Sequence, residues 1–189
     1  LDAVNLMFAG VNVLRQHMKS DARVAGIITE GGMACNVVPD KASCRYYIRS
    51  KERTYLKELT QKIINCAKGA ALMTGAELEY HNFENSYDNL LYNESLRSIL
   101  RRNLEDLGIK NFINDFEASG SSDIGNVSQV CPTVYCEIDT GAYHQVFAHH
   151  ESFLDYVHGK NAENTLLIAT KAMAYTALQI FLEPSLLIK

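Results

Sequence analysis

A chain of 189 residues can hold one sizeable hydrophobic core or two small ones. Its residues are 47% hydrophobic and 21% charged, which is typical of a globular protein and argues against intrinsic disorder. The net charge is -4 and the basic residues form no cluster, so the chain offers no surface for a phosphate backbone. Nucleic acid is therefore not an expected partner.

The cysteines and the apolar runs indicate the cellular environment. The five cysteines form no closely spaced metal-binding pattern, and an odd number does not suggest a disulfide framework, so a reducing compartment is favoured. No run reaches the roughly 18 uninterrupted apolar residues of a membrane span, and no signal-peptide pattern is found. We therefore expect a cytoplasmic protein with no membrane partner. Because the chain begins at Leu1 inside a helical pattern, we also expect it to be a fragment.

The first 82 residues predict a small α+β domain. Apolar residues spaced three and four apart predict an amphipathic first helix that is already under way at the first residue. The later elements follow from β-branched and aromatic strand residues and from a helix-ending glycine. The predicted elements are a helix over 1–19, strands over 23–32 and 42–50, a helix over 51–73 that closes near Gly75, and a strand over 77–83. This order predicts an antiparallel sheet with both helices on one face.

Residues 83–189 predict part of an α/β layer. A polar connection leads to Asn93, the expected N-cap of a helix that begins at the next residue. A Gly/Ser-rich loop that feeds a short helix comes next, followed by a predicted strand over 132–139. A histidine-rich loop and a final helix over 161–181 complete the chain.

The histidine-rich loop is the first candidate site. His144, His149 and His150 lie within a dozen residues of Asp139 and Glu151, in a loop between a predicted strand and a helix. Composition alone is equally compatible with a solvated polar loop. A catalytic zinc takes about three protein ligands with fixed geometry, and adjacent histidines project differently. At most one of the two neighbouring histidines is therefore expected to be a metal ligand.

The small-residue loop over 119–128, SGSSDIGNVS, is the second candidate. Backbone amides from Gly120 to Ser122 could bind an anion. The alternative is an ordinary helix N-cap, in which Asp123 or Ser122 accepts a hydrogen bond from the first turn.

The segment over 30–50, EGGMACNVVPDKASCRYYIRS, is the third candidate. It offers the amide of Asn36 and the guanidinium of Arg49 near one end of the predicted sheet, a fork suited to a carboxylate. The alternative is a hairpin with an exposed arginine at its edge.

Taken in order, these three stretches resemble the second half of the M-twenty metallopeptidases, the family of aminoacylases, carboxypeptidases and N-acyl-amino-acid amidohydrolases. GGMACNVVPDKASCRYYIRS is similar to the family's lid segment, which has Gly-Gly, then Asn-Val-Ile-Pro, then a strand that ends in Arg. SGSSDIGNVS resembles the Gly-Ser-Thr-Asp-Met-Gly-Asn-Val-Ser signature of the amidohydrolase branch. AHHESF, over 148–153, resembles the late His-x-Pro-x-aromatic stretch that supplies the last metal ligand.

The resemblance implies a fold and a set of roles. The fold is an α+β lid or dimerisation domain over 1–82, followed over 83–189 by the C-terminal portion of a zinc-peptidase-like α/β catalytic domain. His149 is the implied metal ligand, with His150 as the alternate, and Asp139 or Glu151 would accept from its other ring nitrogen. The implied substrate-binding residues are Asn36, Arg49, Gly120, Ser121, Ser122 and Asp123. A homodimer through the lid is also implied.

The resemblance also implies an activity. Family members hydrolyse the amide bond of N-acyl amino acids or dipeptides with one or two zinc, manganese or cobalt ions. They carry the other metal ligands and the glutamate general base in an N-terminal half, so we expect this chain to be inactive and to bind no metal tightly by itself. One alternative is a truncated, non-catalytic dimerisation or binding module, and another is an α+β domain without a site.

Overall fold

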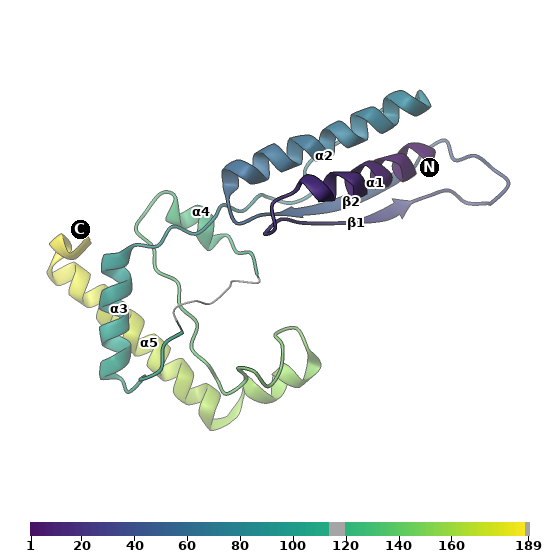
Figure 1. Cartoon of the computed structure of the whole chain (residues 1–189). Helices are drawn as coiled ribbons and strands as arrows, with labels where there is room; N and C mark the ends of the chain where they lie inside the picture. The colour runs from purple at the N-terminus through teal and green to yellow at the C-terminus, as the bar shows by residue number, and fades with distance from the viewer. Residues whose placement is uncertain (114–119, 188–189) are drawn as a thin grey trace. The chain divides into compact units, whose positions relative to one another are not determined.

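A computed structural model describes residues 1–113 and 120–187 (Figure 1). The chain divides into two compact units, unit 1 over Leu1–Asn89 and unit 2 over Leu90–Lys189. The boundary predicted after residue 82 precedes a segment, 83–89, whose contacts belong to unit 1.

Two helices of unit 1 pack against each other. α1 (Asp2–Leu14) runs into a short 3-10 turn, η1 (Arg15–His17), and α2 (Arg53–Thr74) follows the sheet. Buried side chains recur along α2 at helical spacing, and the fully buried Leu59 packs into a cluster with Val11 of α1. α2 ends at Gly75, whose φ of 69° lies in the left-handed region that glycine adopts without strain. The predicted first and second helices are confirmed.

The two strands of unit 1 form an antiparallel hairpin. β1 (Arg23–Glu30) pairs with β2 (Ser43–Arg49), and the register is irregular between Ile28 and Glu30. Side chains alternate between the two faces of the sheet, as the strand geometry requires. Val24, Tyr46 and Ile48 pack with the helices, and Figure 1 shows α1 and α2 on the same side of the sheet. An α+β unit with its helices on one face is therefore confirmed.

The predicted third strand over 77–83 is wrong: the described residues pair only two strands in this sheet. The apolar side chains that suggested it stay largely exposed, Leu78 at 37%, Tyr80 at 59% and Phe83 at 39%. With so little apolar area removed from water, little offsets the entropy cost of ordering the backbone into a ladder.

The end of unit 1 is held by α2. The Arg53 side chain forms an ion pair with Asp88, with Nε 3.0 Å from the carboxylate, and also donates to the hydroxyl of Ser86 and the carbonyl of Tyr87. The backbone N–H of Arg53 donates to the side chain of Asn89. These contacts fix segment 83–89 to the start of α2.

Unit 2 is built on two packed helices. Its elements are α3 (Glu94–Asp106), α4 (Ile124–Ser128), η2 (Glu151–Tyr156), α5 (Gly159–Leu182) and η3 (Pro184–Leu187). The Asn93 side chain accepts from the N–H of Leu96 at 2.9 Å, so the predicted N-cap is confirmed. α3 and α5 enclose a small cluster of Leu100, Leu104 and Ala172.

The strand predicted over 132–139 is also wrong. Val134 and Ile138 pack against the α3–α5 cluster. The described residues of unit 2 nevertheless contain no second strand that could accept its ladder hydrogen bonds. A strand without a neighbour leaves its backbone groups to water, and this segment therefore has no regular structure.

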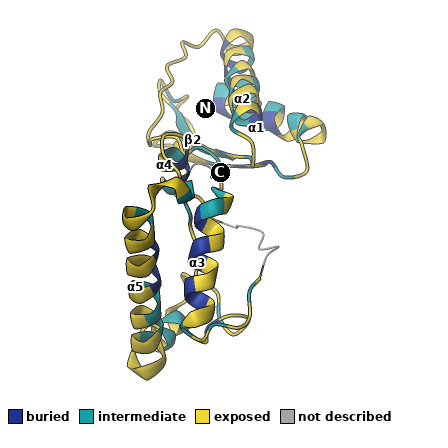
Figure 2. Cartoon of the chain, turned by 90° about the vertical axis from the view of Figure 1, so that its left-hand side faces the viewer, coloured by how far each residue is buried: buried dark blue, intermediate teal, exposed yellow. Residues whose placement is uncertain are grey.

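α5 confirms the predicted final helix and is largely exposed. Figure 2 shows its surface mostly in the colour of exposed residues. It has 24 residues, and its most apolar window of 18 residues has a mean hydropathy of 1.4 and is 11% buried, so by length and composition alone the helix could cross a membrane. A core helix passes the same test, and α5 does bury Ala172 and Thr176 against α3.

Candidate functional site

The histidine-rich loop is shaped by its own backbone. Asp139 accepts hydrogen bonds from the N–H groups of Gly141 at 2.8 Å and Tyr143 at 3.0 Å, an Asx-type turn. His144 follows with a φ of 62°, and its ring lies 3.8 Å from that of Tyr143. Both contacts go to Oδ1, and no hydrogen bond joins Asp139 to His149 in the described residues, so the expectation that Asp139 accepts from His149 is not borne out.

His149 and His150 differ in what their rings do. His150 is the N-cap of η2: its Nδ1 accepts from the N–H of Ser152 at 3.2 Å, so in the neutral ring Nε2 carries the proton and offers no lone pair to a metal while this contact is kept. His149 sits in the turn closed by the His150 N–H and the Phe147 carbonyl, with a φ of 73° that is unusual for a residue other than glycine. Its ring is exposed and makes no hydrogen bond within the described residues. Of the two rings, that of His149 has more nitrogen atoms available to bind a metal, because neither of its nitrogens makes a hydrogen bond within the described residues.

No complete metal site forms in the described residues. Over 1–113 and 120–187, no three His, Cys, Asp or Glu side chains come together as a metal-binding group. His149 can supply one imidazole nitrogen, and Glu151 makes no hydrogen bond to it. One ligand falls short of the roughly three protein ligands that a catalytic zinc site uses.

The small-residue loop lies at the start of α4. Ser122 Oγ accepts from the N–H of Ile124 at 3.3 Å, which is an ordinary cap contact, and Asp123 occupies the N-cap position without a side-chain cap bond. The exposed amides of Gly120 and Ser121 make no hydrogen bond to any described residue. The end of α4 is joined to the segment before α3, because the N–H of Leu91 donates to Ser128 Oγ at 2.9 Å. The arrangement is compatible with both the cap and the anion-binding interpretation, and Ser119 lies outside the described residues.

The hairpin separates Asn36 from Arg49. Asn36 lies on an exposed turn of the loop that joins β1 to β2, closed by a hydrogen bond from the Val37 N–H to the Ala34 carbonyl. Arg49 is the last residue of β2, and β2 spans about 20 Å at roughly 3.3 Å per residue. The prediction that Asn36 and Arg49 form a fork near one end of the sheet is therefore wrong for a single hairpin, because the two residues lie toward opposite ends.

The loop that carries Asn36 depends on one glycine. Gly32 has a φ of 111°, and a Cβ added to it would lie only 2.6 Å from Cγ of Pro39. Both the backbone conformation and the close approach therefore require glycine. This contact folds the loop back on itself and presents the turn at Asn36 to solvent.

Arg49 has neighbours that the sequence interpretation did not single out. It pairs across the hairpin with Arg23, and its guanidinium lies 5.7 Å from the centroid of the Tyr47 ring. Tyr47 donates to Glu84 in turn, and this hydrogen bond is the main cause of the raised pKa of its hydroxyl. The alternation Arg-x-Tyr-x-Arg over 45–49 was the available signal, because alternate residues of a strand share a face.

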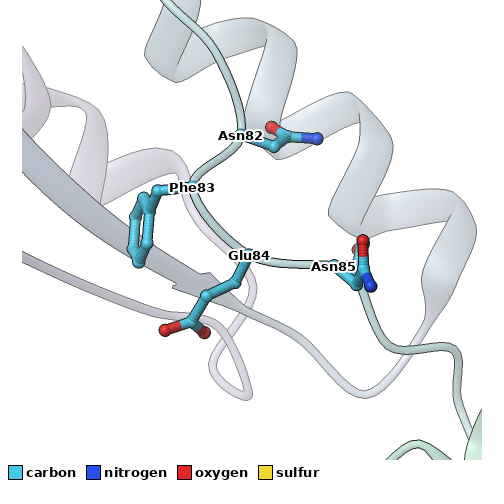
Figure 3. A pocket seen from close by; sticks show the side chains of 5 residues that line it. Asn82, Phe83, Glu84 and Asn85 are labelled. Carbon is cyan, nitrogen blue, oxygen red and sulfur yellow. The ribbon is translucent and has the colours of Figure 1, made fainter.

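A shallow hollow of about 380 Å³ lies along segment 82–86. In Figure 3 the side chains of Phe83 and Glu84 extend to one side of the segment, and that of Asn82 extends to the other. None of the residues predicted to bind metal or substrate lines it. We therefore assign it no role in the candidate site.

Comparison with known proteins indicates the class of enzyme that this chain resembles. No family model matches the chain. The chain is 36% identical over 193 residues to the Xaa-Arg dipeptidase of Mus musculus and 35% identical over 190 residues to that of Homo sapiens. It is also 37% identical over 109 residues to one of the subunits of the p-aminobenzoyl-glutamate hydrolase of Escherichia coli K12.

These matches cover the relatives unequally. The dipeptidase alignments include 99% of this chain but only 44% and 43% of the relatives, and the hydrolase alignment includes 57% of this chain and 22% of the relative. The chain thus spans less than half the length of the curated relatives it matches. The resemblance to the M-twenty metallopeptidases is confirmed, because the relatives that align with this chain are named a dipeptidase and a hydrolase.

Proposed function

We propose that this chain is part of a longer metal-dependent amidohydrolase that cleaves the amide bond of dipeptides or N-acyl amino acids. The observation that carries the proposal is the alignment of 99% of the chain with named dipeptidases. One relative is named for an Xaa-Arg dipeptide and another for an acyl-glutamate, so an amide bond next to a free amino-acid carboxylate suits both names.

The predicted residues have different roles in this proposal. His149 donates one imidazole nitrogen to a zinc, manganese or cobalt ion, which would polarise the amide carbonyl. Arg49 binds the substrate's carboxylate through paired N–H groups. Asn36 lies toward the opposite end of the hairpin and does not share this carboxylate. The amides of Gly120 to Ser122 would bind an anionic group of the substrate, next to Asp123 at the N-cap position of α4. The remaining metal ligands and the general base are proposed to lie in the part of the relatives that this chain does not span.

Two assays test the proposal. The 189-residue chain should show no turnover of dipeptides or N-acyl amino acids with zinc, manganese or cobalt, because one ligand does not fix a catalytic metal. Appreciable turnover would overturn the expected inactivity. A longer polypeptide that contains this chain should hydrolyse one of these substrates, and failure with every metal and substrate would overturn the function.

The two adjacent histidines offer a matched pair for the longer protein. His149→Ala should lower kcat by at least about 100-fold and reduce the bound metal, because it removes a direct ligand. His150→Ala should mainly loosen the start of η2, since it removes the cap contact to Ser152. The reverse ranking would move the ligand to His150.

We also propose a cytoplasmic homodimer through unit 1. The five cysteines are free, as in a reducing compartment. The two-stranded sheet of the described residues has unpaired strand edges, where a second chain could add its own strands. Sedimentation that gives only a monomer at high concentration would overturn the dimer.

One observation favours the alternative of a non-catalytic binding module. Unit 1 encloses its own core, so it could act without the rest of an enzyme. The hydrolysis assay of the longer polypeptide separates the two functions.

A further inference from the structure

The face of the unit 1 sheet that is turned away from the helices carries three arginines, and Phe83 and Glu84 contact it at Tyr47. Strand alternation turns Val24 and Ile48 toward the helices, so the residues between them face away from α1 and α2. The exposed side chains of this face, by cross-strand pairs, are Arg23 with Arg49, Ala25 with Tyr47, and Ile27 with Arg45.

The pair of Arg23 and Arg49 is unfavourable without a ligand. The two residues are direct cross-strand partners, whose Cβ atoms in an antiparallel sheet are about 5 Å apart. Like charges placed directly opposite each other destabilise a sheet. No carboxylate of the described residues forms an ion pair with either guanidinium. An anion between the two would relieve this repulsion.

Arg23 is held by the residues just before its strand. Its Nη1 donates to the carbonyl of Ser20 at 2.7 Å and to that of Ala22 at 2.8 Å. An arginine has five N–H donors, so the edge formed by Nε and Nη2 remains available for a bidentate contact with a carboxylate. The guanidinium is therefore positioned before any ligand arrives.

Arg49 is supported in a different way. Its guanidinium lies over the Tyr47 ring, and that ring packs edge-on against Phe83 at 5.3 Å. A cation–π contact occupies the face of the guanidinium and leaves its N–H edges available. It makes no hydrogen bond to any residue in the described ranges.

We propose that Arg23 and Arg49 together bind the two carboxylates of an acidic C-terminal residue, aspartate or glutamate, in the substrate. Two adjacent guanidinium groups match two closely spaced carboxylates, whereas a neutral C-terminal residue would leave the Nε–Nη2 edge of Arg23 without an anion. The substrate part of this inference rests on the proposed function; the carboxylate pair is a property of unit 1 alone. Arg49 takes the α-carboxylate, and Arg23 determines specificity for the side-chain carboxylate.

The test is a titration of the 189-residue chain with N-acetylglutamate and N-acetylalanine at low ionic strength, followed by NMR of the arginine Nε–Hε groups. N-acetylglutamate should bind about threefold to tenfold more tightly, which is the range of an exposed charge pair, and salt should reduce the difference. Arg23→Gln should reduce the affinity for N-acetylglutamate to that for N-acetylalanine and leave the latter unchanged. Arg49→Gln should weaken both ligands.

Arg45 supplies the matched control. It lies on the same face and strand, and its guanidinium lies 5.5 Å from the Phe83 ring centroid, much as that of Arg49 lies over Tyr47. Arg45→Gln should keep the preference for the dicarboxylate. If it abolishes the preference as fully as Arg23→Gln does, the face attracts anions only through its overall charge, and the specific pair is overturned. No preference in the unmodified chain also overturns it, and unchanged backbone amide spectra show that the variants are folded.

Failure of this inference and failure of the proposed function give different results. A longer protein that hydrolyses N-acyl amino acids, combined with no dicarboxylate preference in this chain, removes only the carboxylate pair. A preference that disappears in Arg23→Gln, combined with no hydrolysis by the longer protein, removes only the proposed function.

Discussion

Unit 1 and unit 2 differ in how many of their apolar side chains are buried and in which elements bury them. In unit 1 two helices cover one face of a hairpin, and six buried residues form one cluster: Val11, Ala22, Val24, Tyr55, Leu59 and Ile63. In unit 2 the α3–α5 cluster has three buried members, and α5 leaves large apolar side chains in solvent, including Met173 at 68% and Phe181 at 82% exposed.

The difference shows where the local sequence pattern is enough to predict the packed structure. The elements of unit 1 are neighbours in sequence and bury one another, so their pattern and their packing agree. In unit 2 the segment predicted as a strand has no strand beside it in the described residues, and the exposed face of α5 has no described partner. We propose that the part of the relatives not spanned here supplies both, and the following predictions test this comparison.

The largest expected effect is at the centre of unit 1. Leu59→Ala should destabilise the unit by about 2–5 kcal/mol, because Leu59 is fully buried and its removal leaves a cavity. Urea unfolding followed by circular dichroism, with amide exchange in α2 to locate the change, measures it. Leu72→Ala in the same helix is the control: at 85% exposure it should change stability by less than about 0.5 kcal/mol. Equal effects would mean that unit 1 has no core of its own.

The stability of unit 2 should depend most on a buried polar side chain. The buried Asn103 donates to Thr176 at 2.9 Å and to Gln179 at 3.1 Å, which links α3 to α5. Asn103→Ala should cost about 1–3 kcal/mol, because it leaves the buried hydroxyl oxygen of Thr176 without its donor. Amide exchange in α3 and α5 measures the loss, and the exposed Arg102→Ala should leave it unchanged. An equal loss of protection in α2 would show that the two units are not independent.

Replacing either of two glycines, one inside α2 and one at its end, should change the stability of unit 1 in opposite directions. Gly75→Ala should destabilise unit 1 by about 1–2 kcal/mol, since a Cβ is strained at its φ of 69°. Gly69→Ala should stabilise the unit by about 0.5–1 kcal/mol, because Gly69 is inside the helix with nothing within 4 Å of an added Cβ. Thermal unfolding measures both. The same sign for both variants would mean that Gly75 does not end the helix as described.

The smallest expected effect is a pH dependence at the entry to the sheet. The amide N–H of Lys51, and then the hydroxyl of Ser50, donate to Asp21 and lower the pKa of its carboxyl from 3.8. The folded state therefore binds this proton more weakly than the unfolded state, so the stabilisation is present above the unfolded pKa and is lost as pH falls through the lowered folded pKa.

Asp21→Asn measures this contribution. The difference in Tm between the unmodified chain and the variant should be largest near neutral pH and should shrink below about pH 4. Asp40→Asn, a change at an exposed carboxylate on the β1–β2 loop, should show no such trend. A difference for Asp21→Asn that grows on acidification would contradict the assigned sign.

The residues of the candidate site were easier to predict from the sequence than their arrangement in space. The motif residues Asn36, Arg49, Gly120 and His149 could be named from their order and spacing, but their mutual geometry could not. The spacing from Asn36 to Arg49 suggested a fork, whereas pairing with β1 carries Arg49 away from the loop and beside Arg23. A long-range partner of this kind is set by strand register, which no local pattern displays.

The sequence by itself determined the helices, the hairpin, the Asn93 cap, the glycine end of α2 and the resemblance to the M-twenty metallopeptidases. These depend on side-chain periodicity and on contacts between residues close in the chain. Only the tertiary structure decided that residues 77–83 and 132–139 lack strand pairing, that the His150 ring caps a helix while that of His149 does not, and that Arg23 faces Arg49. The physical reason is that a ladder, a ring's hydrogen bonds and a cross-strand pair each require a second group, and its position is fixed only when the chain folds.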